Sequence, residues 1–194
     1  MKKVYNEIIA RLICAIDAGA NEEQWIKPWN HEAHAISDAQ CIDALLVKYY
    51  EREKIPCVNE FGDRSFYSPA ADAITLPKKE QFISIDAYNA VKAHETIHST
   101  GDYTRCNRET FSEFKTFTFG DVRYSREELV AEIGACFLLA TFGLNTDFAE
   151  YNAGAYIGNW IKHLNNNTYW IYRASELAEE AVEYIIDVTQ RSRK

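Results

Sequence analysis

AHETIHSTGDY, residues 93–103, contains two histidines four residues apart, with a glutamate directly after the first. The apolar spacing before this stretch and the glycine at its end predict a helix that begins at Ser84 or Asp86. Side chains four residues apart lie on one face of a helix, so His94 and His98 can reach one ion. The spacing therefore predicts a metal site, and the alternative is a pair of surface histidines on a solvated helix.

The residue types in this motif suit zinc chemistry. Neutral imidazole binds Zn²⁺ at about 2.0–2.1 Å, and zinc lowers the pKa of a bound water toward about 7. Glu95 projects about 100° around the helix from His94, so its carboxylate lies beside the expected ion. We therefore expect Glu95 to be the general base that accepts a proton from the attacking water.

Two histidines leave the predicted site one protein ligand short, because a catalytic zinc has three such ligands and an open position. The chain has three further histidines, His31, His34 and His163, but none continues the motif as H-E-x-x-H-x-x-G-x-x-H. A carboxylate from EELVAE, residues 127–132, is the better candidate, because it opens a second strongly apolar helix expected over residues 124–144.

Within EELVAE, Glu128 and Glu132 share one helical face. We expect Glu128 to be the third ligand and Glu132 to accept the free N–H of a ligand histidine. The alternative is a capping box, in which Glu128 bonds back to the backbone of Ser125 and Glu132 becomes the ligand. Tyr124 is a candidate hydrogen-bond donor to an oxyanion, with packing as its alternative role.

Composition limits the classes of partner. The chain has 194 residues, 47% of them apolar, and a formal net charge of −8, which argues against general nucleic-acid binding. Its five cysteines are odd in number and include no C-x-x-C pair. This pattern predicts a protein of the reducing cytoplasm without a thiolate zinc site. No apolar run approaches the length of a membrane span, so we expect no membrane association.

The remaining patterns predict an α+β domain, mostly helical, with a small antiparallel sheet. RSFYS (64–68) and AITL (73–76) are strand candidates that the turn-like PAAD separates, so we expect them to pair antiparallel. Residues 102–123 show no helical period, and we expect a loop there. Further helices are expected over residues 3–19, 38–53 with Asp38 as cap, 153–164, and near the C-terminus.

Taken in order, these residues resemble a known family. A-H-E-x-x-H-x-T-G, the spaced Arg105 and Arg108, F-G-x-x-x-Y-x-x-E-E-L-V-A-E-I-G-A and Y-I-x-x-W are similar to the zincin-like metallopeptidase domain of ArdC-type antirestriction proteins, which are related to ImmA/IrrE-like metallopeptidases. The resemblance implies a zincin-like fold, Zn²⁺ or another divalent metal, and Glu95 as general base. The E-x-x-A pattern of the relatives is similar to Glu128 with Ala131, which implies Glu128 as the third ligand.

The resemblance also divides the chain. It implies a zincin-like metallopeptidase domain over residues 55–194, which acts on a peptide or protein substrate. Residues 1–54 are similar to a reduced form of the single-stranded-DNA-binding region of these proteins, so single-stranded DNA is a second candidate partner. The competing hypothesis is a non-catalytic antirestriction or DNA-associated binding protein with a structural metal.

Overall fold

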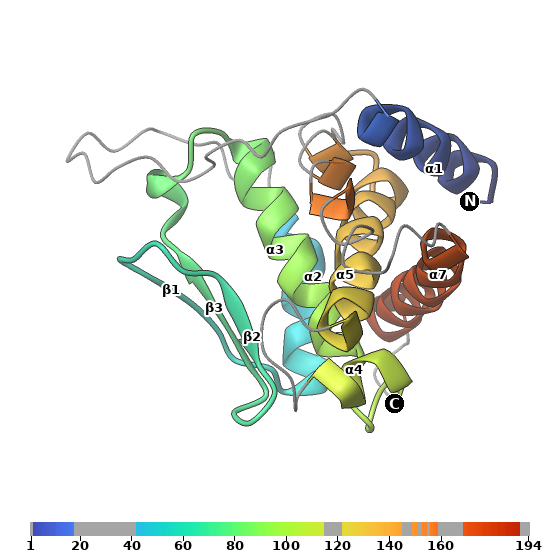
Figure 1. Cartoon of the computed structure of the whole chain (residues 1–194). Helices are drawn as coiled ribbons and strands as arrows, with labels where there is room; N and C mark the ends of the chain where they lie inside the picture. Colours follow the sequence, from blue (N-terminus) through green and yellow to red (C-terminus); the bar gives the residue numbers. More distant parts are fainter. Residues whose placement is uncertain are drawn as a thin grey trace.

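The computed structural model in Figure 1 describes residues 2–17, 42–114, 122–144, 149–150, 153–154, 156–158 and 169–190. It confirms the predicted α+β class, with the long helices on one side of a small sheet (Figure 1). Its helices are α1 (Lys2–Asp17), α2 (Asp43–Glu53), α3 (Ile85–Thr100), α4 (Glu109–Phe114), α5 (Val122–Thr141) and α7 (Tyr169–Gln190), and a short 3₁₀ helix covers Lys79–Gln81. The strands are β1 (Cys57–Glu60), β2 (Phe66–Ser68) and β3 (Ala73–Pro77).

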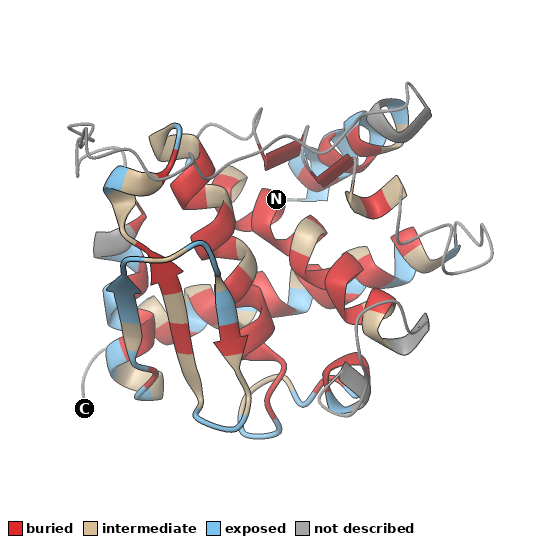
Figure 2. Ribbon diagram, turned by 60° about the vertical axis from the view of Figure 1, so that its left-hand side comes forward, coloured by how far each residue is buried: buried red, intermediate tan, exposed pale blue. Residues whose placement is uncertain are grey.

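The sheet is mixed, with the strand order β1-β3-β2. β2 and β3 pair antiparallel with Tyr67 opposite Ile74, as the sequence predicts. The small antiparallel sheet that the sequence predicts lacks one strand, because β1 adds to β3 in parallel, with Cys57 opposite Ile74. β3 turns back from β2 and enters between the two earlier strands, so it runs in the direction of β1. Figure 2 shows that β1 is mostly exposed, whereas the central β3 is mostly buried or half-buried.

Helix α3 lies between the sheet and α5, and α7 covers another side of α5 (Figure 1). The sheet presents Tyr67, Ile74 and Leu76 to this interior, and all three are buried. Ser84 begins α3 as expected, because its hydroxyl accepts a hydrogen bond from the Ala87 N–H at 3.0 Å. A helix enclosed on two sides has little solvated surface, which explains why α3 is buried along most of its length.

The approach of α3 to α5 depends on a glycine. A Cβ built on Gly134 would lie 2.9 Å from both γ-carbons of Ile97, which is fully buried. Glycine in a helix interior costs about 1 kcal/mol relative to alanine, so close packing accounts for its presence. Ile97 immediately precedes His98, and Gly134 follows Glu128 by less than two turns. The crossing therefore sets the separation of the two helices that carry the candidate site.

The expectation of a loop over residues 102–123 is wrong in part. Residues 109–114 form α4, and α5 begins at Val122, while the residues between them lie outside the described part of the chain. α4 is too short to show a helical period in the sequence. Phe111 holds it in place, since this fully buried ring packs on the ring of Tyr67, with the centroids 5.8 Å apart.

The N-terminal helices share the buried core of the chain. Tyr5 of α1 stacks on Phe137 of α5 with ring centroids 3.9 Å apart, and α2 packs on α7. The proposed cap Asp38 lies outside the described residues, and the division of the chain after residue 54 stays a prediction. None of the described helices has both the length and the apolar content that are needed to cross a bilayer.

We predict that Gly134→Ala destabilises the fold. The new methyl group must displace Ile97 or separate α3 from α5, and such overpacking typically costs about 1–3 kcal/mol, which exceeds the gain in helix propensity of about 1 kcal/mol. Chemical denaturation measures the free energy of unfolding. Gly62→Ala is the matched control, because no atom lies within 4 Å of a Cβ at that position. A Gly134→Ala protein as stable as the wild type would contradict this account of the crossing.

Candidate metal centre

The two motif histidines project from consecutive turns of α3 and face each other. Their Nε2 atoms are 3.1 Å apart, and the two rings meet edge to face. His98 is buried, and His94 is nearly so. The two histidines therefore direct one imidazole nitrogen each toward a common point. A pair of solvated surface histidines would have no reason to adopt this arrangement.

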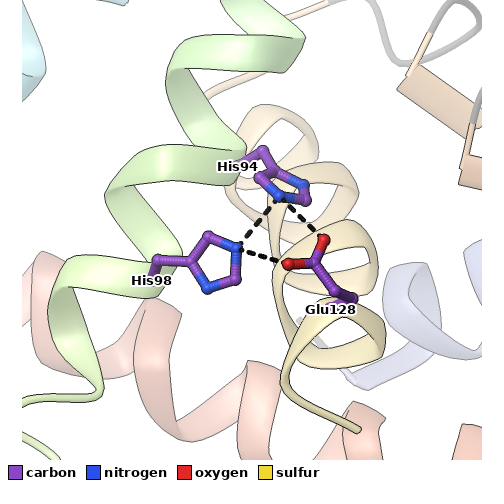
Figure 3. Close-up of side chains that lie close together, drawn as sticks. All are labelled: His94, His98 and Glu128. Atoms are coloured by element: carbon purple, nitrogen blue, oxygen red, sulfur yellow. Dashed lines mark hydrogen bonds and ion pairs between the residues drawn. The ribbon is translucent and has the colours of Figure 1, made fainter. Parts of the chain in front are cut away.

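Glu128 of α5 completes a group of three (Figure 3). Its Oε2 lies 3.6 Å from Nε2 of His94, and its Oε1 lies 3.5 Å from Nε2 of His98. Two ligand atoms on a tetrahedral ion, each about 2.0–2.1 Å from it, are about 3.3–3.4 Å apart. The observed separations are close to this value, so the three side chains fit one divalent metal ion.

The capping-box alternative for Glu128 is wrong. A cap at Ser125 requires the helix to begin at the following residue, whereas α5 begins at Val122 and Ser125 is buried inside it. The Glu128 carboxylate points toward the histidines instead. Burial raises the pKa of this carboxyl, but the hydrogen bond from His94 and the nearby His98 outweigh burial and lower the pKa overall.

Two further carboxylates of α5 face the outer nitrogens of the histidines. Oε1 of Glu132 lies 3.5 Å from Nδ1 of His94, the contact that the sequence predicts. Oε1 of Glu127 lies 3.4 Å from Nδ1 of His98, a contact that sequence reasoning missed. A carboxylate at Nδ1 favours a hydrogen on that nitrogen and leaves Nε2 with its lone pair. Both Nε2 atoms are therefore suited to bind a metal.

The predicted general base lies beside this group. Glu95 is buried, and its Oε2 accepts a hydrogen bond of 2.8 Å from the backbone N–H of Tyr67 in β2. Burial raises the pKa of the Glu95 carboxyl, although the neighbouring His94 and His98 act in the opposite direction. A carboxylate whose pKa moves toward neutrality is a more effective proton acceptor at neutral pH.

Tyr124 also reaches the group. Its hydroxyl forms a hydrogen bond with Glu128, and burial together with that carboxylate raises the pKa of the phenol. The hydroxyl thus keeps its proton and can donate it in a hydrogen bond. The other histidines of the chain, His31, His34 and His163, lie outside the described residues.

Comparison with known proteins identifies the family of this chain. A profile of zincin-like metallopeptidases matches residues 48–177. The chain belongs to the zincin-like metallopeptidase family. Two proteins of Escherichia coli named DNA primase TraC are each 37% identical to this zincin-like chain over 130 and 129 residues. These matches cover 67% and 66% of the chain but 8% and 12% of the primases, so most of each primase has no counterpart here.

Crystal structures of the antirestriction protein ArdC from plasmid R388 share the fold. The Mn(II)-bound structure has a TM-score of 0.61 and 27% identity, and the match covers 86% of the zincin-like chain and 60% of ArdC. The metal-free structure has a TM-score of 0.58 and 27% identity, with 85% and 55% covered. These matches confirm the ArdC-type zincin-like domain. Together with the three converging side chains they support a divalent-metal site.

We predict that Glu128→Gln lowers the affinity of the zincin-like domain for Mn²⁺ or Zn²⁺ by more than about 100-fold. Loss of a residue that only orients a ligand typically costs about 10–100-fold, and loss of the ligand itself should cost more. Isothermal titration calorimetry measures the affinity. Glu109→Gln on the exposed surface of α4 is the control. Equal affinity of Glu128→Gln and wild type would exclude Glu128 as a ligand.

Proposed function

We propose that this protein is a metal-dependent peptidase of the antirestriction type found on plasmids and phages. His94, His98 and Glu128 bind Zn²⁺ or another divalent ion, and Glu95 is the general base. The observation that carries the proposal is the convergence of three ligand atoms beside a buried carboxylate whose pKa is raised. A divalent ion in such a site supplies an acidified water and polarises the carbonyl that the water attacks.

The protein side chains have separate tasks in this reaction. Oε2 of Glu95 is held by the Tyr67 amide, so Oε1 is the oxygen that accepts the proton of the attacking water. Glu95 can then pass this proton to the leaving amine. Tyr124 keeps its hydroxyl proton, and this donor turns from Glu128 to the oxyanion that develops on the substrate once Glu128 is engaged by the metal. Glu132 orients His94 through its Nδ1.

The sheet offers a way to align a peptide. β2 is an edge strand, packs on α3, and is tied directly to Glu95. An extended peptide that adds to an exposed strand forms main-chain hydrogen bonds along it. Strand addition beside β2 would place the peptide backbone close to Glu95 and the three ligands, which favours a peptide or protein substrate over a small ester or amide.

We predict that Glu95→Gln abolishes hydrolysis and retains metal binding. The amide is nearly the same shape as the carboxylate but accepts no proton at neutral pH. The assay incubates the metal-loaded protein with a peptide library and detects new termini by mass spectrometry, while calorimetry measures metal affinity. If the metal-loaded wild type cleaves no peptide, or if Glu95→Gln cleaves as fast as the wild type, the peptidase proposal fails.

The names of the relatives favour one alternative of a different class. DNA primase TraC and antirestriction protein ArdC both point to plasmid DNA metabolism, which is compatible with a non-catalytic DNA-associated protein in which the metal is structural. The net charge of −8 opposes this alternative, because an acidic surface repels phosphates.

We predict weak or no binding of single-stranded DNA by this chain. Fluorescence anisotropy with a labelled oligonucleotide, at about 50 mM and about 200 mM salt, measures the affinity and its salt dependence. The metal-loaded and Glu95→Gln proteins serve as a pair, because a DNA-binding role should not depend on this carboxylate. Tight binding by both proteins would support the DNA-associated alternative.

A further inference from the structure

The described part of the chain contains a buried charged cluster against the second histidine, made of Arg108, Thr110 and Glu127. We propose that Glu127 is a positioning residue that Arg108 and Thr110 hold in place. Glu127 fixes the tautomer of His98, so that Nε2 of His98 is free to bind the metal before the metal arrives. This inference rests on the metal site proposed above and assigns a task to residues outside the ligand set.

Both oxygens of Glu127 are engaged. Arg108 donates from Nη2 to Oε1 at 2.6 Å and from Nε to Oε2 at 3.3 Å. The Thr110 hydroxyl donates to Oε2 at 2.6 Å. Oε1 is also the oxygen that lies 3.4 Å from Nδ1 of His98. A carboxylate held at three points has one orientation, and in that orientation it faces the histidine.

The charge of Glu127 is what selects the tautomer. Its side chain is 0% exposed and that of Arg108 is 1% exposed, so the two ions are buried as a pair. Arg108 pairs with Oε1 at 2.6 Å and donates a second hydrogen bond to Oε2, so the buried carboxylate is the partner of a buried cation. An ionised carboxylate only accepts hydrogen bonds. The nitrogen of His98 that faces it therefore carries the hydrogen, and Nε2 is left with its lone pair toward His94 and Glu128.

Arg108 is fixed to the same helix that carries His98. Its Nη2 also donates to the Ile97 carbonyl at 2.8 Å, and its Nη1 donates to the Thr100 hydroxyl. These groups belong to the last turn of α3, one residue before and two residues after His98. Arg108 and His98 are therefore held together at the end of α3, and Glu127 joins them to α5. We call Arg108, Thr110 and Glu127 together the clamp.

The two histidines differ in this respect. The side chains of His94 and its carboxylate Glu132 are 15% and 13% exposed, whereas those of His98 and Glu127 are 4% and 0% exposed. Within the residues that the structure describes, Glu132 has no lysine or arginine within 4.0 Å. Water can therefore reorganise around His94 more easily than around His98, so loss of Glu127 should affect the site more than loss of Glu132.

Glu127→Gln tests the assignment through the tautomer itself. Oε1 of Glu127 faces both Nη2 of Arg108 and Nδ1 of His98. In the variant the amide oxygen therefore takes this position, and the NH₂ faces the Thr110 hydroxyl. The acceptor at Nδ1 then remains but has lost its charge, which weakens the preference of His98 for the Nδ1–H tautomer. Long-range ¹H–¹⁵N NMR of the metal-free protein reports the tautomer, and calorimetry with Mn²⁺ or Zn²⁺ reports affinity. We expect a smaller population of the Nδ1–H tautomer than in the wild type, and a loss of affinity of about 10–100-fold.

Arg105→Met is the matched control. Arg105 lies three residues before Arg108, its side chain is also 1% exposed, and it donates to the Ser99 carbonyl at 2.8 Å and to Asp72 at 2.6 Å. Its hydrogen bonds and ion pairs go to residues other than His94 and His98, so this variant should lose stability but keep the His98 tautomer and the wild-type metal affinity. Equal losses of affinity in Arg105→Met and Glu127→Gln would overturn the proposal, because they would reflect general destabilisation.

Two more variants complete the test. Glu132→Gln should lower metal affinity less than Glu127→Gln, and the reverse order would overturn the ranking of the two histidines. If Glu127→Gln does not fold, Thr110→Val removes one of the hydrogen bonds to Glu127 and leaves its charge pair intact. Thr110→Val should give a smaller loss of affinity in the same direction, and unchanged affinity would contradict the proposal.

The outcome for the metal site can be separated from the outcome for the clamp. A wild-type protein that binds neither Mn²⁺ nor Zn²⁺ would refute the proposed function. The tautomer of His98 in the metal-free protein would still test the clamp. A population of the Nδ1–H tautomer that is the same in Glu127→Gln and in the wild type would refute the role of Glu127, even if the wild type binds metal tightly.

Discussion

The close contact of Ile97 with Gly134 is the constraint on which the rest of the structure depends. Glycine allows α3 and α5 to approach until the side chain of one packs on the backbone of the other. His94 and His98 come from one of these helices and Glu128 from the other. A wider spacing would leave two imidazoles on one helix and a carboxylate out of reach on the next. The packing of an apolar pair therefore decides whether three polar side chains can share an ion.

The electrostatics of the site follow from this geometry. Four carboxylates, those of Glu95, Glu127, Glu128 and Glu132, surround two imidazoles in a largely buried volume. Among the residues that the structure describes, Glu127 is the one of these four that has a buried arginine partner, whereas Glu95 accepts a hydrogen bond from the Tyr67 N–H. Concentrated negative charge in a low-dielectric interior is unfavourable unless a cation offsets it. The ligand atoms converge at a point where a bound divalent cation would offset this negative charge. For this reason we favour a metal over a purely structural hydrogen-bond network.

Much of this arrangement can be predicted from local patterns in the sequence. His94 and His98 are four residues apart, which places them on one face of α3. Glu128 and Glu132 have the same spacing, which places them on one face of α5. The turn between RSFYS and AITL predicts their pairing. The contacts that were missed depend on tertiary structure. Three of the four residues of β1 are exposed, so this strand buries no regular set of apolar side chains and has no alternating pattern that could reveal it in the sequence. Glu127 and Arg108 are 19 residues apart and belong to different elements, so no local pattern joins them.

The segment that follows α3 explains why these distant residues meet. A Cβ on Gly101 would lie 2.5 Å from the ring of Phe111 and 2.9 Å from Arg108, so only glycine lets the chain fold back this tightly. The segment from Gly101 to Phe111 thereby brings Arg108 into contact with Glu127, next to His98. It also brings Arg105 to Asp72, in the turn that joins β2 to β3. Since β2 holds Glu95 through a backbone amide, the same short segment supports both the proposed ligands and the proposed base. The Thr-Gly pair after H-E-x-x-H is thus a packing requirement of the site, although neither residue is a candidate ligand.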